Sequence, residues 1–444
     1  SLIFSGIKPI IDFGWMMTLG LTVSFVVTFL LLPTLINFLP IKKIEIKEEK
    51  SKITKFLSDF TLNNKNLVIA SSIVFLLISL FGISKLEVEN SFINYFKKNT
   101  EIYKGMKLID EKLGGTTPLE VILNFPKKIE EDIKDEDFED WEEEDSGGEE
   151  KYWFTKDKID KINLVHNYLE TLPEVGKVLS FSSLLEVAKK LNNNKELGTL
   201  EMGVLYSKIP DYIKSEIVDP YISIEKNQAR INLRIKDSEP ELRRNNLINK
   251  IKSDLETKLG FKKSEYELAG ILILFNNLLQ SLFKSQILTL GFVMAGIFMM
   301  FLILFKNLTL SLIGVVPNFI AAFFILGIIG ILEIPLDMMT ITIAAITIGI
   351  AVDNSIHYIY RFKEEFILKK NYEETIKYCH STVGIAILNT SITIVFGFSI
   401  LVFSNFIPTI YFGVFTGIAM LLALFSVLTL LPALLVVFRP FKLN

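Results

Sequence analysis

The chain has 444 residues, of which 50% are apolar and 22% are charged, with a formal net charge of −3 and a mean hydropathy of +0.41. Such a high apolar content is not typical of a water-soluble protein. The chain also lacks the excess of basic residues that is typical of nucleic-acid-binding proteins, so no nucleic-acid partner is expected. The apolar residues form long runs, which indicate a polytopic α-helical membrane protein.

Seven apolar runs of about 18 residues or more are long enough to cross a bilayer as helices. They lie at 9–39, 67–84, 287–305, 308–332, 336–360, 381–403 and 409–438. Lys and Arg are concentrated in short segments on one side, with seven in 40–65 and five in 361–380. The positive-inside rule therefore predicts that these segments face the cytoplasm and that the block 85–286 lies outside.

The expected location is the cytoplasmic (inner) membrane of a bacterium, with the large domain in the periplasm and the tail 439–444 in the cytoplasm. The single cysteine, Cys379, leaves the external domain without disulfides, and that domain has no Asn-x-Ser/Thr acceptor sequence. Both absences favour a bacterial envelope protein over a eukaryotic surface receptor.

The start of the chain repeats a segment near its end. SLIFSGIKPIIDFGWMMTLG at 1–20 aligns without gaps with ILVFSNFIPTIYFGVFTGIA at 400–419, and Pro9 and Gly14 coincide with Pro and Gly there. Helix-breaking residues in register indicate an internal repeat, so the chain is expected to be the C-terminal part of a longer protein with two parallel repeats. A complete seven-span protein is the alternative.

The repeat predicts six parts. They are the last span of a first repeat at 1–40, a cytoplasmic linker at 41–66, the first span of the second repeat at 67–84, the external domain at 85–286, a five-span bundle at 287–438 and a cytoplasmic tail at 439–444.

The external domain shows alternating strand and helix signals, which predict an α+β fold of ferredoxin-like type. Strands are expected at 117–125, 221–236 and 264–270, and amphipathic helices at 100–115, 157–173 and 239–260. The segment 129–150 has fourteen acidic residues and one lysine. A calcium site or a surface for cationic partners is one interpretation, but self-repulsion favours a disordered, solvated loop.

An aspartate lies inside the predicted span 336–360. In GIAVDNSIHYIYRFKEE, Asp353 costs about 2.5–3.5 kcal/mol at a helix centre, so it needs a role. Helical periodicity places Thr342, Gly349 and His357 on the same face as Asp353, and this face is expected to pack against other helices. A proton-relay acid is the functional interpretation, and a hydrogen-bonded helix-packing residue is the alternative.

The following span carries a matching polar seam that includes Asn389 and Thr393. The two seams are expected to line a small polar pocket, although Thr342, Asn389 and Thr393 also suit ordinary interhelical hydrogen bonding. His357 extends the proton path or is simply solvated at the interface. His166 and His380 are placed in hydrophilic surroundings and given no role.

Several stretches resemble the resistance-nodulation-division (RND) superfamily of exporters. They are PNF at 317–319, IPLDMMTITIAAITIGIAVDNSIHYIYRFKEE at 334–365 and AILNTSITIVFGFSILVFS at 386–404. The most similar branch is the MMPL-type lipid and hydrophobe exporters, which include hopanoid transporters; Patched and the sterol-sensing proteins are more distant. The resemblance implies twelve spans in two repeats, each with a porter-type domain, and proton flow through acids in the middle spans.

Carried onto this sequence, the resemblance makes Asp353 the proton-relay acid, with a partner acid in the first repeat. The other positions that fall within the family motifs are Pro317, Asn318, Gly349, Asn354, Thr390, Ser391 and Gly397. Two positions depart from the pattern, because Asn354 stands where relatives often have Tyr or Asp and Ala351 replaces a glycine.

The expected function is proton-driven export of lipids or other hydrophobic molecules. The alternatives are a Sec-linked protein-export motor and a non-transporting receptor or scaffold of sterol-sensing type. Expected partners are membrane lipids or hydrophobic small molecules as substrate and the missing N-terminal repeat, with a periplasmic carrier or a homo-oligomer left open. No cofactor, metal or enzymatic activity is expected, because no metal-ligand spacing, phosphate loop or nucleophile constellation is present.

Overall fold

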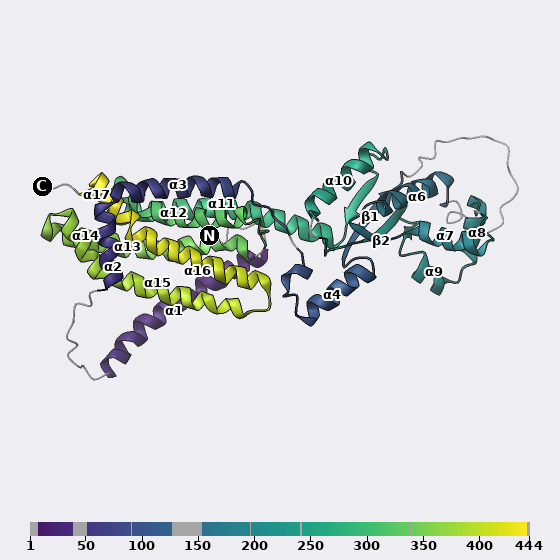
Figure 1. Ribbon diagram of the computed structural model, residues 1–444. Helices are drawn as coiled ribbons and strands as arrows, with labels where there is room; N and C mark the ends of the chain where they lie inside the picture. Colours follow the sequence, from purple (N-terminus) through teal and green to yellow (C-terminus); the bar gives the residue numbers. More distant parts are fainter. Residues whose placement is uncertain are drawn as a thin grey trace, which may run out of the picture. The chain divides into compact units, whose positions relative to one another are not determined.

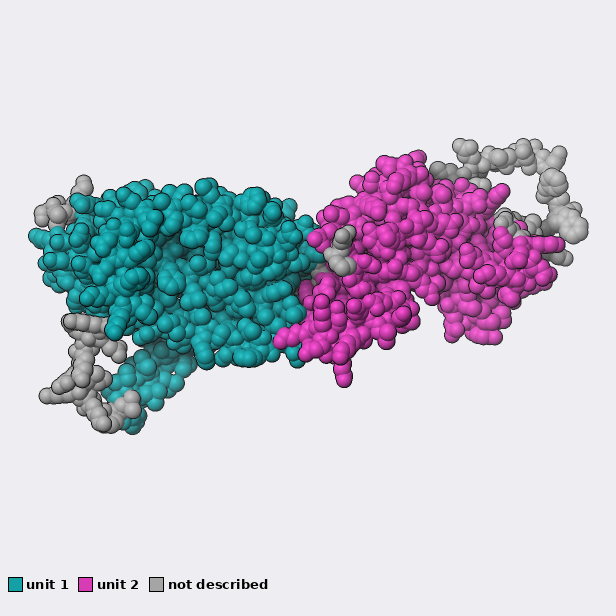
Figure 2. All heavy atoms as spheres, viewed as in Figure 1, with its two compact units in different colours: residues 1–90, 278–444 teal, residues 91–277 magenta. Residues whose placement is uncertain are grey.

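The computed structural model describes residues 8–38, 51–89, 91–126, 153–195, 197–239, 242–337 and 339–441. The expected acidic loop 129–150 lies outside these ranges. The chain forms two compact units (Figures 1 and 2), which are Ser1–Asn90 with Leu278–Asn444 (unit 1) and Ser91–Asn277 (unit 2).

Unit 1 is a helical bundle, and seven helical segments of the described chain are long and apolar enough to cross a membrane, as predicted. The long helices are α1 (Lys8–Phe38), α3 (Lys65–Ile83), α11 (Ile271–Phe305), α12 (Leu308–Ile331), α13 (Ile343–Lys369), α15 (Val383–Ser399) and α16 (Ile407–Leu428). Shorter elements are α2 (Lys52–Asn63), η3 (Thr340–Thr342), α14 (Tyr372–Ser381), η4 (Ile400–Phe403) and α17 (Leu430–Phe438).

Helix α12 lies at the centre of unit 1, where it packs against α3, α13 and α16 (Figure 1). The contact with α3 is backbone against backbone, because a Cβ built on Gly327 would lie 2.6 Å from the Cα of Ser79. A Cβ on Gly82 would meet the backbone of Gly327, and one on Gly330 would meet the backbone of Gly82. Small residues at these positions therefore allow the two helices to approach closely, as in other membrane helix pairs.

Unit 2 is an α+β domain in which helices pack on an antiparallel sheet. The strands are β1 (Thr117–Asn124), β2 (Val175–Leu179), β3 (Ile222–Ser223), β4 (Gln228–Ile235) and β5 (Tyr266–Ala269). The helices are α4 (Glu101–Lys112), α6 (Lys156–Glu170), α7 (Phe181–Leu191), α8 (Thr199–Lys208), α9 (Asp211–Ile217) and α10 (Arg244–Thr257), with a 3-10 turn η2 at Ile93–Tyr95.

The sheet order β2-β4-β1-β5, with every pairing antiparallel and β3 added to β4, is the order of a ferredoxin-like fold. The predicted strands 117–125, 221–236 and 264–270 are confirmed, the middle one as a hairpin that turns at Asn227 with φ of +54°. Strand β2 was not predicted, since its five residues VGKVL are too few to show a pattern. Helices α7, α8 and α9 were also missed.

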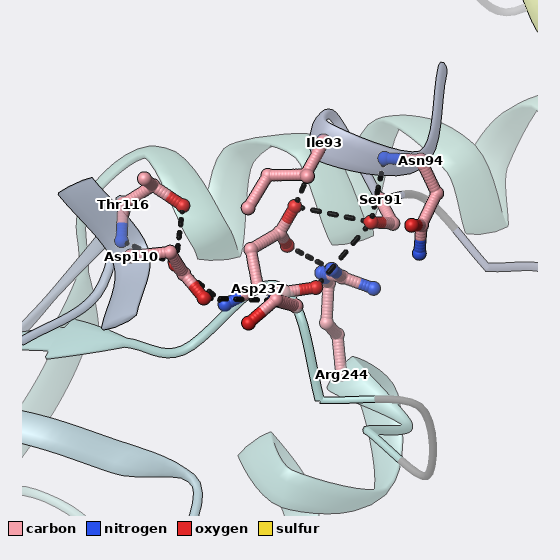
Figure 3. A network of polar contacts seen from close by, with 8 residues as sticks. Ser91, Ile93, Asn94, Asp110, Thr116, Asp237 and Arg244 are labelled. Atoms are coloured by element: carbon pink, nitrogen blue, oxygen red, sulfur yellow. Dashed lines mark hydrogen bonds and ion pairs between the residues drawn. The ribbon is translucent and has the colours of Figure 1, made fainter. Parts of the chain in front are cut away.

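Two buried carboxylates fix the start of β1 and the end of β4 (Figure 3). Asp110 accepts hydrogen bonds from the backbone N–H groups of Thr116, Asp237 and Ser238, each at 2.9 Å, and from the Thr116 hydroxyl at 2.7 Å. Asp237 forms an ion pair with Arg244 and accepts a hydrogen bond from the Ile93 N–H at 3.3 Å. The network holds four segments of unit 2 together.

Asp110 gives a prediction about acid stability. Burial would raise the pKa of Asp110, but the hydrogen bonds from Ser238, Thr116 and Asp237 outweigh it and hold the pKa below its ordinary value of 3.8. The stabilisation is therefore complete above about pH 4 and is lost as the pH falls through the lowered pKa of the folded protein. Asp110→Asn, which turns an acceptor into a donor facing N–H groups, should cost about 1–3 kcal/mol at neutral pH.

Thermal unfolding of the wild type and the variant across pH 2–8 checks this expectation: the difference should shrink on the acid side. Asp160→Asn, at an exposed position on α6, is the matched control. An equal difference at every pH would mean that the charge of Asp110 contributes nothing.

Two histidine interpretations were wrong, since neither side chain lies in hydrophilic surroundings. His166 is only 3% exposed, and its Nδ1 lies 2.8 Å from the Ser180 hydroxyl. His380 is 1% exposed because α14 folds against the bundle, where Nε2 donates to the carbonyl of Leu428 at 2.9 Å and Nδ1 lies 3.1 Å from the Tyr358 hydroxyl. Burial lowers the pKa of His380.

Candidate functional site

The candidate site lies on α13, which begins later than predicted. The helical segment that is long and apolar enough to cross a membrane is Thr340–Lys369, which begins four residues after the predicted start at 336, because Asp337 ends the preceding loop. Its Oδ1 accepts the backbone N–H groups of Met339 and Thr340, both at 2.8 Å, and so caps the turn that leads into α13. Burial raises the pKa of Asp337, although these hydrogen bonds act in the opposite direction. Asp353 consequently lies about 20 Å along the span from Thr340, near its middle.

One polar face of α13 is packed inside unit 1. The amide of Asn318, in α12, donates to the Ser355 hydroxyl at 3.0 Å and to the carbonyl of Gly314 at 3.0 Å. The amide of Asn354 donates to the Ser391 hydroxyl of α15 at 3.4 Å. Asn318, Ser355 and Ser391 are fully buried. This face joins α13 to its two neighbours by hydrogen bonds at membrane depth, as interhelical polar residues do.

Four of the family-motif positions thus belong to the helix-packing face, namely Pro317, Asn318, Asn354 and Ser391. Pro317 lies within α12 beside Asn318, which bonds the carbonyl of Gly314 one turn earlier. The sequence analysis did not single out Ser355. The only sequence feature that could have indicated it is that it is small, polar and adjacent to Asn354. The Oδ1 atom of Asn318 is buried and has no hydrogen-bond partner among the described residues.

The opposite polar face of α13 is exposed, which contradicts the expectation that it packs against helices of this chain. The side chains of Asp353 and His357 are 71% and 63% exposed, and they form an ion pair with His357 Nε2 3.3 Å from Asp353 Oδ1. A Cβ on Gly349 would meet nothing within 4 Å. The helix turns Asn354, not Asp353, toward α15.

The polar seam of α15 is exposed as well. The prediction that this seam and Asp353 together line a pocket is therefore wrong for the described residues. Thr393 donates to the carbonyl of Asn389 at 2.9 Å and Thr390 to that of Ala386 at 3.0 Å, each within its own helix. Asn389, Thr390 and Thr393 are exposed, and a Cβ on Gly397 would meet nothing within 4 Å.

Thr342 also departs from its predicted place. It ends η3, ahead of α13, and its hydroxyl donates to the carbonyl of Met339 at 2.8 Å. It therefore stabilises the turn at the start of the span and does not reach the level of Asp353, which lies eleven residues further along the chain.

Comparisons with known proteins agree with this architecture. The model of the MMPL family matches residues 166–443, which include most of unit 2 and the five spans from α11 onward. A protein of Methanocaldococcus jannaschii, described as a membrane protein, is 32% identical over 154 residues. The matched segment is 35% of this chain and 40% of that relative.

Proposed function

The chain belongs to the MMPL family, and from that premise we propose that it is part of a transporter that moves lipids or other hydrophobic molecules out of a cell membrane. We further propose that proton flow through Asp353 drives this transport. Seven helices of the described residues that are long and apolar enough to cross a membrane, together with a separate α+β unit, support this proposal.

The observation that carries the proposal is the exposure of Asp353 at membrane depth. A carboxylate at a helix centre costs about 2.5–3.5 kcal/mol to insert, and residues of this kind face protein or water in place of lipid. The ion pair with His357 offsets only part of that cost, since both side chains are mostly exposed. A polar covering is therefore needed over this face, which we call the α13–α15 face and define by Gly349, Asp353, His357, Asn389 and Thr393.

We propose that helices of a first repeat cover the α13–α15 face. Gly349 leaves open space on it, and so does Gly397 one turn beyond Thr393 on α15, which would let a partner helix approach closely. The hydroxyls of Thr390 and Thr393 already bond within α15, so what the face offers to a partner is chiefly Asp353, His357 and the Asn389 amide. These groups suit a partner helix that carries an acidic or a basic side chain, which would share a proton with Asp353.

In the proposed mechanism, Asp353 takes a proton from the outer side and loses it to the cytoplasmic side. Protonation removes its charge and weakens its pairing with His357 and with the covering helices, so that one repeat can move against the other. One proton that moves down 100 mV yields about 2.3 kcal/mol, which is available for transport. Unit 2 would receive the transported molecule outside the bundle.

The test is transport in proteoliposomes that contain the full gene product. Fluorescent lipid analogues and an enclosed pH-sensitive dye report movement of cargo and protons together. We expect cargo movement only when a proton gradient is imposed, and its arrest by a protonophore. Cargo movement at the same rate with and without the proton gradient would contradict the proposal that protons drive transport. Absence of both cargo flux and proton flux would favour a receptor or scaffold.

A further inference from the structure

The sheet of unit 2 has one covered face and one open face. Along β1, Leu119, Val121 and Leu123 are fully buried in the core, and the alternate residues turn to the other side. Strand β4 repeats the pattern, with Ile231 buried in the core and Asn232, which is half-buried, on the other face. An antiparallel sheet tolerates one solvated face, so exposure alone indicates no function.

The open face is hollowed into a cleft of about 790 Å³. Its wall is formed by the end of α4, the start of β1, strand β2 and strand β4. Five basic residues and two acidic residues line it, namely Lys112, Lys177, Arg230, Arg234 and Lys236 with Glu111 and Glu120. The cleft therefore has a positive excess, although the chain as a whole has a net charge of −3.

Some of these charges are already compensated. Arg230 donates to the carbonyl of Pro220 at 2.8 Å and lies 3.9 Å from Glu120, and Lys236 donates to the carbonyl of Pro173 at 3.4 Å. Glu111 lies 3.6 Å from Lys107, outside the cleft. Both acids of the cleft are thus engaged.

Two further cations in the cleft, Lys177 and Arg234, have no ion pair or side-chain hydrogen bond with another described residue. They are direct cross-strand partners in the pairing of β2 with β4. Like charges in directly opposite positions destabilise a sheet pair, and here no described acid neutralises them. An anion between the two side chains would remove this repulsion and accept hydrogen bonds from both.

The wall beside these cations is fixed in place. Gly114 has φ of +80°, and a Cβ there would lie 2.8 Å from the Cβ of Lys177, so the loop after α4 lies directly against β2. The same loop is held by Asp110, which bonds the Thr116 N–H and hydroxyl (Figure 3). The cleft is therefore preorganised, which lowers the cost of binding.

An apolar stripe leads along α4 into the cleft. Ile102, Met106, Ile109 and Leu113 follow at intervals of three and four residues, which places them on one helical face. Ile102, Ile109 and Leu113 are 54%, 43% and 57% exposed, and Leu113 itself lines the cleft. Apolar surface thus continues directly into a cationic site.

We propose that unit 2 binds an anionic amphiphile, with its hydrocarbon chain on the α4 stripe and its acidic headgroup between Lys177 and Arg234. Uncharged or zwitterionic amphiphiles would lack the group that the opposed cations require. The inference rests on the proposed function in one respect, since it names the class of molecule that the transporter would take up. The binding itself does not depend on proton flow or on Asp353.

The test is equilibrium binding to the full chain in nanodiscs of zwitterionic lipid, with no proton gradient and empty nanodiscs as background. Decyl phosphate, decyl phosphocholine and inorganic phosphate are the three probes. We expect decyl phosphate to bind at least about tenfold more tightly than either of the others, because only it offers both the chain and a dianionic group. The double variant K177Q/R234Q should lose at least about tenfold of that affinity.

The matched control is K252Q/K263Q, which removes two exposed cations outside the cleft lining. It should leave decyl phosphate binding unchanged. The unfolding midpoint of K177Q/R234Q should not fall, because the substitution relieves like-charge repulsion. An unchanged or higher midpoint would exclude misfolding as the cause of lost binding.

Equal loss in both double variants, or no loss in K177Q/R234Q, would overturn the proposal. Inorganic phosphate that binds as tightly as decyl phosphate would also overturn it, since the site would then recognise a free anion. Asp353→Asn should retain full binding, so failure of the proton-driven mechanism and failure of this site give different results.

Discussion

Asp353→Asn is expected to abolish proton-coupled transport while leaving the fold intact. The substitution keeps the size of the side chain but removes the group that can gain and lose a proton. The side chain is 71% exposed and its contact in the described chain is the ion pair with His357, so little packing is lost. A transporter that loses the drive of one proton at 100 mV loses about 2.3 kcal/mol, or about fiftyfold in the concentration ratio it can sustain.

The measurement is the steady-state cargo ratio across proteoliposomes of the full gene product, together with proton uptake, for the wild type and the variant. Glu333→Gln serves as control, because Glu333 is an exposed acid in the loop between α12 and the Asp337 turn. It should transport as the wild type does. Unchanged proton uptake in Asp353→Asn, with intact protein, would assign Asp353 to packing between repeats and would contradict the proposed relay.

Gly327→Val is expected to be strongly destabilising, because α3 and α12 contact each other through their backbones at this point. A Cβ at Gly327 would lie 2.6 Å from the Cα of Ser79 and 2.9 Å from its carbonyl oxygen. Backbone atoms cannot rotate away as a side chain can, so the helices must separate. Overpacking of this kind costs typically about 1–3 kcal/mol, and valine adds two methyl groups beyond the Cβ.

Thermal unfolding in detergent measures the effect, with Gly291→Val as control. Gly291 lies within α11, where a Cβ would meet nothing within 4 Å, so the same change of residue tests helix propensity without the close contact. We expect a clear fall in the unfolding midpoint for Gly327→Val and a small one for Gly291→Val. Similar shifts in both variants would mean that the close approach of α3 and α12 does not limit stability.

The sequence by itself determined the membrane-spanning segments and most of the sheet. Long apolar runs specify spanning helices, because lipid cannot satisfy a polar backbone or polar side chains. Alternation in QARINLRI specified β4, in which every buried residue is apolar. Alternation in TPLEVILN specified β1 less completely, because polar Thr117 is buried with Leu119, Val121 and Leu123 while Ile122 is only partly buried. The sequence also determined that Asp353 lies within a spanning helix, and hence that it needs an explanation.

The tertiary structure alone decided which face of α13 packs inside the bundle. Both Asp353 with His357 and Asn354 with Ser355 are polar, and helical periodicity says only which residues share a face. The structure turns Asn354 and Ser355 inward, where each has a hydrogen-bond partner on a neighbouring helix, and leaves Asp353 exposed. Patterning cannot make this choice, because the choice depends on the partner helices and not on the polarity of α13.

Burial of His380 and the opposition of Lys177 and Arg234 were likewise decided only in three dimensions. His380 lies in a short polar helix whose packing depends on the Leu428 carbonyl, 48 residues away. Lys177 and Arg234 are 57 residues apart in sequence and become neighbours through the register of β2 on β4. Register and helix packing arise from contacts between distant segments, whereas periodicity records only what each segment does alone.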